Sequence, residues 1–87
     1  MAGVWVASLD RFGYDLMVVE KSKEKAKAAM SAEYIKTYFK LNKAWGDMPY
    51  DSVEDLVAND EEFQEYYKTA MDEMYVRKLE YGVVEWG

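Results

Sequence analysis

The sequence predicts a small α+β domain with the element order ββααβ and one short extra helix. Three observations lead to this fold class. Two runs rich in β-branched and aromatic residues, separated by a glycine-containing turn, lie near the N-terminus. Two later segments repeat their apolar residues at helical spacing. A third β-rich run follows Gly82, and we expect the 87 residues to form a single domain.

The first two runs, residues 3–9 and 14–20, predict an antiparallel hairpin whose turn lies at residues 10–13, where Gly13 can adopt a positive φ. Side-chain alternation divides this hairpin into two apolar faces. One predicted face holds Val4, Val6, Leu16 and Val18. The other predicted face holds Trp5, Ala7, Met17 and Val19. We expect one face to pack on the helices and the other to be covered by a later segment or left as an adhesive surface.

Residues 23–41 predict the first long helix, with Ser22 as its N-cap. Its predicted apolar stripe consists of Ala28, Ala32, Ile35 and Phe39. Gly46 and Pro49 mark a loop over residues 42–50. Trp45 in this loop either folds back over the core or is presented to a partner. We favour the first arrangement, because small domains seldom expose a tryptophan.

Two further helices are expected in the acidic part of the chain. Asp51 and Glu54 have the spacing of a capping box and predict a short helix near residues 51–58. A longer helix starts at Asn59 or Asp60, and its apolar pattern is regular as far as Met74. Beyond that point the pattern inverts, so the helix either ends early or continues, and residues 83–86 predict a short strand that joins the hairpin. The expected core includes Ile35, Phe39, Phe63, Tyr67 and Met74.

Composition argues against several classes of function. The chain has no histidine and no cysteine, which removes the commonest general base and the usual zinc ligands. It also lacks a nucleophile elbow, a P-loop and the spacing of an EF-hand. We therefore expect a non-enzymatic protein without a metal or cofactor. No apolar run reaches the roughly 18 residues of a membrane span and no secretion signal is visible, so we expect a cytoplasmic location and no membrane contact.

Negative charge is concentrated in residues 47–73, which contain ten acidic residues and one cation, Lys68, in a chain of net charge −6. Such a surface repels nucleic acid and attracts a basic partner. Glu61 and Glu65 are separated by about 6 Å along a helix axis, close to the repeat of backbone phosphates. The alternative is a solvated surface whose acids stabilise helix N-termini. The candidate partner-binding residues are Trp45, Asp47, Tyr50, Asp51, Glu54, Asp55, Glu61, Glu62, Glu65, Asp72 and Glu73.

Three segments carry a resemblance: residues 4–14 (VWVASLDRFGY), 33–38 (EYIKTY) and 84–86 (VEW). With them the chain resembles small uncharacterised proteins of bacterial mobile elements and phages. In size, acidity and layout it is also similar to anti-CRISPR proteins, several of which block Cas nucleases by mimicking DNA. The resemblance implies an inhibitor in the bacterial cytoplasm whose acidic helices occupy the basic nucleic-acid groove of a defence nuclease, such as a Cas nuclease. The alternative is a small protein–protein interaction module or homodimer that uses the apolar hairpin face.

Overall fold

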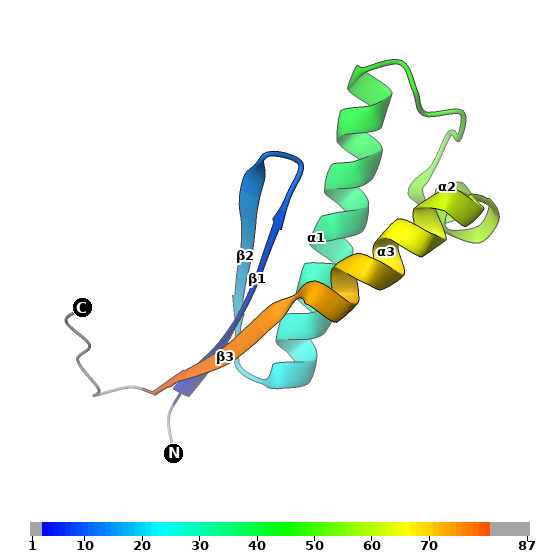
Figure 1. Cartoon of the computed structure of the whole chain (residues 1–87). Helices are drawn as coiled ribbons and strands as arrows, with labels where there is room; N and C mark the ends of the chain where they lie inside the picture. Colours follow the sequence, from blue (N-terminus) through cyan, green and yellow to red (C-terminus); the bar gives the residue numbers. More distant parts are fainter. Residues whose placement is uncertain (1–2, 81–87) are drawn as a thin grey trace.

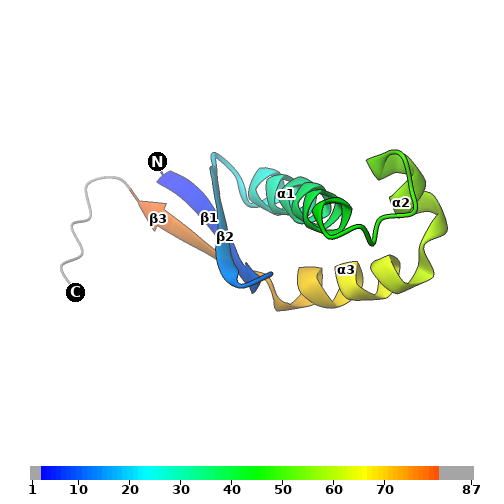
Figure 2. The same ribbon diagram turned by 90° about the horizontal axis from the view of Figure 1, so that it is seen from above.

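The computed structural model describes residues 3–80 of the chain. Its elements, in order, are β1 (Gly3–Arg11), β2 (Tyr14–Glu20), α1 (Lys23–Ala44), α2 (Val53–Asn59), α3 (Glu61–Glu73) and β3 (Tyr75–Glu80) (Figure 1). The predicted α+β class is confirmed. The strands form one antiparallel sheet in the order β2-β1-β3, and all three helices lie on one side of it (Figure 2). No helix in residues 3–80 is long and apolar enough to cross a membrane.

The β1–β2 hairpin closes with a two-residue turn. Phe12 (φ 60) and Gly13 (φ 84) both have positive φ, which is the arrangement of a type I′ turn and matches the twist of the flanking strands. Glycine adopts this conformation readily, but a bulky aromatic residue does so rarely. Contacts outside the turn must therefore hold Phe12 in place.

The predicted division of the hairpin into two faces is wrong. With the two-residue turn, an even-numbered residue of β1 shares a face with an odd-numbered residue of β2. The predicted faces instead combined even-numbered residues of both strands on one face and odd-numbered residues of both strands on the other. The inner face, toward the helices, holds Ala7, Leu9, Leu16 and Val18. The outer face holds Val4, Val6, Met17 and Val19.

α1 begins as predicted and ends later than predicted. The Ser22 hydroxyl accepts a hydrogen bond from the backbone N–H of Lys25 at 3.2 Å. The helix continues past Leu41 to Ala44 and stops at Gly46, whose φ is 80. There the Gly46 and Asp47 N–H groups donate to the carbonyl oxygens of Lys43 and Asn42, which is the Schellman motif.

The apolar stripe predicted for α1 is also wrong. The buried side is formed by Ala26, Met30 and Tyr34, which repeat every four residues. Ala28 and Ala32 are exposed, and Ile35 and Phe39 are half-buried at the edge of the core. Apolar residues occupy much of the circumference of α1, so spacing alone does not select the side that packs. Contact with the sheet and with α3 selects it.

The core joins the inner face of the sheet to the helices. Phe63 is buried as predicted, together with Leu56 and Ala70, while Tyr67 and Met74 are half-buried against them. The hydroxyl groups of Tyr67 and Ser31 form a hydrogen bond that links α3 to α1. The two helices are therefore joined by both apolar and polar contacts.

The N-caps of α2 and α3 are Ser52 and Asp60. The Ser52 hydroxyl accepts from the Asp55 N–H at 3.2 Å, so the predicted capping box of Asp51 and Glu54 is wrong. Asp60, one of the two predicted starts of α3, accepts from the Phe63 N–H at 2.8 Å.

The sheet is completed by β3, which follows α3 directly. Of the two alternatives for α3, the early end is correct, because the helix stops at Glu73 and Met74 is extended (φ −59, ψ 132). The apolar pattern no longer fits a helix after Met74 because the chain is a strand there and its side chains alternate between the two faces of the sheet: Val76 packs on the core opposite Ala7, and Tyr75 lies on the other face. The third strand is thus residues 75–80, and the predicted strand at residues 83–86 lies outside the described residues.

Candidate functional site

The nine acidic candidate residues are all exposed in the structure. They come from the segment before α2, from the first turn of α2 and from α3. Their members are Asp47, Asp51, Glu54, Asp55, Glu61, Glu62, Glu65, Asp72 and Glu73. Acids in the first turns of α2 and α3 also complement the helix dipole. Within residues 3–80 no three of the carboxylates are grouped so that they could hold a metal ion.

The acids of α3 divide into two groups around the helix. Phe63 and Ala70 face the core. In a helix of 3.6 residues per turn, Glu61, Glu65 and Asp72 then lie on the opposite side. We call these three residues the outer acids. Lys68 falls on the same arc, so the outer acids do not form an unbroken anionic stripe.

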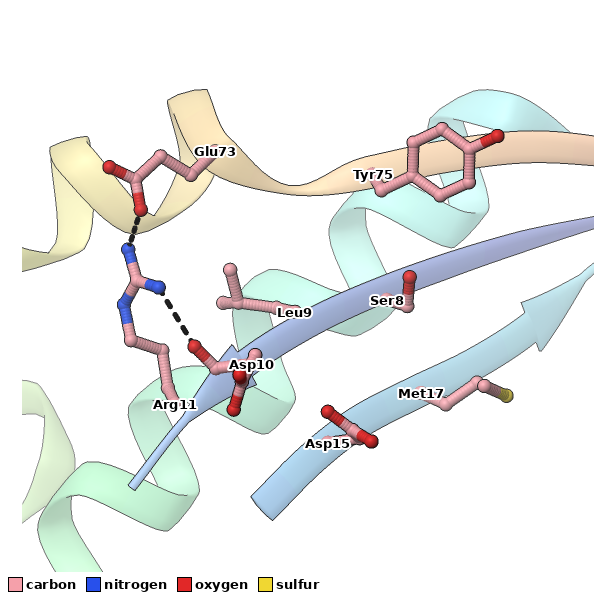
Figure 3. Close-up of a pocket in the computed structure, with 8 residues that line it drawn as sticks. All are labelled: Ser8, Leu9, Asp10, Arg11, Asp15, Met17, Glu73 and Tyr75. Carbon is pink, nitrogen blue, oxygen red and sulfur yellow. Dashed lines mark hydrogen bonds and ion pairs between the residues drawn. The ribbon is translucent and has the colours of Figure 1, made fainter. Parts of the chain in front are cut away.

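The second group, Glu62 and Glu73, lies on the flank of α3 that faces the hairpin tip. There Arg11 forms an ion pair with Glu73 and donates to the backbone carbonyl of Asp10 at 2.8 Å (Figure 3). The charge of Glu73 is thus matched within the molecule. Arg11 was not expected at the site, because the turn that directs it toward α3 is visible only in the fold.

A shallow pocket of about 430 Å³ lies beside this ion pair (Figure 3). Asp10 and Asp15 line it, and they are direct partners across β1 and β2. Two like charges in this relation repel each other and extend the acidic surface onto the hairpin. The register of the hairpin, had it been predicted correctly, would have revealed this pair.

The outer face of the sheet carries no helix, and its side chains are mainly apolar, with Arg77 opposite Val6 as an exception. Three of its side chains are more than half exposed: Met17 (61%), Val19 (56%) and Tyr75 (62%). Val4 and Leu79 are partners on the same face. Of the two alternatives for the second hairpin face, the part of the chain that the structure describes shows it uncovered.

A groove of about 580 Å³ lies between α1, α3 and the hairpin tip, and we call it the aromatic groove. Its walls include Phe12, Tyr34, Tyr38, Trp45 and Tyr66. The Phe12 ring lies 5.3 Å from the Tyr34 ring and 6.2 Å from the Tyr38 ring, measured between centroids. Glu62 and Arg11 also line the groove.

Trp45 does not cover the core. Its side chain is 64% exposed, so the favoured prediction of a tryptophan folded over the core is wrong. The extra turn of α1 is the reason, because it makes Trp45 the C-cap residue at the end of the aromatic groove. The candidate Tyr50 is half-buried and packs against the core.

Three tyrosines beside the acids titrate above their ordinary range. Burial raises the pKa of Tyr34, with a smaller opposing effect from Arg11. Burial first, and then the negative charges of Asp60 and Glu62, raise the pKa of Tyr38. Desolvation, the charge of Asp60 and a hydrogen bond with that carboxylate raise the pKa of Tyr50. These phenols stay neutral at physiological pH and line or flank a region of negative potential.

The chain matches no protein-family model, no curated protein and no solved structure.

Proposed function

We propose that the protein is a non-enzymatic binding module of the cytoplasm that seats its acidic helices on a basic surface of a partner protein. The observation that supports this most directly is the exposure and charge of the nine acidic candidates. Among residues 3–80, Glu73 is the one member of this set with an ion-pair partner. The remaining carboxylates are free to attract and orient a cationic partner.

The narrower form of the proposal is inhibition by DNA mimicry. A nucleic-acid-binding groove presents Lys and Arg at positions that match backbone phosphates, and the outer acids Glu61 and Glu65 are about 6 Å apart along α3. The partner would then be a nucleic-acid-binding protein such as a Cas nuclease. Lys68 weakens the mimicry on this arc, so the acids before and within α2 contribute the rest of the anionic surface.

A second candidate function is self-association through the outer face of the sheet. It is favoured by the exposure of Met17, Val19 and Tyr75, because large exposed apolar patches commonly mark protein contacts. The two candidates use different surfaces and different forces. The acidic surface gives binding that weakens as salt rises, whereas an apolar contact is retained.

The test is to capture partners from a bacterial lysate and then to ask whether the captured protein keeps its nucleic acid. The proposal predicts that the protein and the nucleic acid compete for one surface and that raising salt weakens both complexes. A partner that binds this chain and its nucleic acid at the same time would contradict the mimicry. A captured partner whose affinity does not change with salt would contradict the acidic surface as the binding site.

A further inference from the structure

The aromatic groove differs from the rest of the acidic surface because it is concave and lined by rings. Its volume of about 580 Å³ is in the range of sites that bind small molecules or single side chains. Tyr66 and Trp45 are 52% exposed or more, although both line the groove, so their rings are accessible to a ligand. Tyr34 is buried and Tyr38 half-buried, and these rings form the floor.

The charge of the groove is negative. Glu62 lines it, and the carboxylates of Asp60 and Glu62 both act on the Tyr38 hydroxyl. Among the described residues the one cation in the lining is Arg11, and its guanidinium is already paired with Glu73. An entering anion would meet Glu62 without a free counter-charge. An apolar group would remove water from the Glu62 carboxylate without giving it a hydrogen bond or an ion pair.

We propose that the aromatic groove receives an arginine side chain of a basic partner, with the guanidinium stacked on the rings of Tyr66 and Trp45 and paired with Glu62. A planar, weakly hydrated guanidinium can stack on a ring and also donate two hydrogen bonds to a carboxylate. Lysine offers a compact, strongly hydrated charge and fits less well. That the partner is a basic protein is taken from the proposed function. That the rings and Glu62 form a site for a guanidinium does not depend on the proposed function.

Two capped amino acids test the site directly. Capped arginine and capped citrulline have nearly the same shape, but citrulline has no charge. Each is titrated at millimolar concentration into the intact protein, and binding is followed by the NMR signals of the Trp45 indole and of the tyrosine rings. Capped arginine should shift Trp45, Tyr38 and Tyr66, and capped citrulline should bind at least about threefold more weakly.

Matched variants then locate the contacts. Glu62→Gln should weaken capped arginine by about threefold or more, whereas Glu61→Gln, one residue away in the same first turn of α3 but on the outer arc, should leave it unchanged. Tyr66→Leu should weaken it, and Tyr66→Phe, which keeps the ring, should not. Folding of each variant is checked by circular dichroism, and all three positions are exposed.

The outcomes are separable from those for the acidic surface. Equal binding of arginine and citrulline, absence of ring shifts, or equal losses in Glu61→Gln and Glu62→Gln would each overturn the arginine site. The difference between capped arginine and capped citrulline and the loss expected for Glu62→Gln do not depend on the outer acids, because a capped amino acid does not need the extended surface. Glu61→Gln changes one outer acid and serves as the control. Loss of a protein partner on changing the outer acids, with capped arginine binding intact, would support both sites independently.

Discussion

The ring of Phe12 lies 5.3 Å from the ring of Tyr34, so a residue of the hairpin turn packs on the middle of α1. This contact explains why an aromatic residue occupies a turn position with φ 60. The positive φ costs about 1–2 kcal/mol for a residue other than glycine or asparagine. Packing against Tyr34 and Tyr38 offsets that cost and fixes the hairpin against the helix.

Two changes at Phe12 separate the strain from the packing. Phe12→Ala loses the ring and keeps the strained backbone, so we expect a loss of about 2 kcal/mol in the free energy of unfolding. Phe12→Asn loses the same ring but tolerates the positive φ, so its loss should be about 1 kcal/mol smaller. Urea unfolding measures both values. Equal stability of the two variants would show that the turn is not strained.

Phe63 should be the most sensitive aromatic position of α3. It is 1% exposed and contacts rings of both α1 and α3, so Phe63→Ala should cost about 3–5 kcal/mol, a large part of the stability of a small domain. Tyr66→Ala on the same helix, with its half-exposed ring, is the matched control and should cost about 1 kcal/mol or less. Thermal unfolding compares the two. Similar losses would mean that the buried side of α3 is assigned incorrectly.

Stability should fall at alkaline pH. Tyr34 and Tyr38 have raised pKa values in the folded state, whereas in the unfolded chain they titrate near the ordinary value of 10.0. The stability that neutral phenols contribute is therefore fully present below pH 10 and is lost as the pH rises from there through the folded-state pKa values. Urea unfolding between about pH 9 and pH 11 should show this decline, with a slope of up to about 1.4 kcal/mol per pH unit for each phenol. A flat profile, or a rise, would contradict the burial of these hydroxyl groups.

Self-association through the sheet has a simple test. A double variant, Val19→Lys with Met17→Lys, places charges on the outer face, where both side chains are exposed, and it should therefore keep the fold. If the outer face forms a dimer, the parent protein should sediment as a dimer whose association is unchanged or tighter at high salt, and the double variant should be monomeric. A monomeric parent protein at high concentration would exclude this contact.

An element of the fold is predicted well from the sequence where local chemistry determines it, and poorly where tertiary packing does. The strands of the hairpin and the caps Ser22 and Asp60 depend on local chemistry, and they were predicted at or near their positions. The register of the hairpin was not, because the stretch at residues 10–13 allows several loop lengths, and the two-residue turn is favoured by tertiary packing of the Phe12 ring on α1 and of the inner strand residues on the core. The helix end before Met74 was among the alternatives, but the strand at residues 75–80 that follows it was not predicted.

In the candidate site, too, local features were predicted and contacts between distant segments were not. Exposure of acids such as Glu61 and Glu65 follows from helical spacing, which was predicted correctly. The ion pair of Arg11 with Glu73 joins residues from β1 and the end of α3, and no local pattern predicts such a contact. The aromatic groove also combines three elements distant in sequence. Trp45 belongs to it because α1 is longer than its apolar pattern indicated.

The central claim, that the acidic helices bind a basic partner, is tested most directly by reversing the outer acids. Glu61, Glu65 and Asp72 are changed together to lysine, and a control variant carries the same three reversals at Glu20, Glu24 and Glu33, which are exposed or partly exposed and lie outside the acidic surface. Both variants therefore have the same net charge. Circular dichroism verifies that each is folded.

The three immobilised proteins are exposed to the same bacterial lysate at two salt concentrations, and the proteins retained are quantified. We predict that the parent and the control retain the same basic proteins at low salt and release them at high salt. The variant of the outer acids should retain at least about tenfold less, because each reversal replaces an attraction by a repulsion. A folded variant of the outer acids that retains these proteins as well as the parent does would contradict the claim.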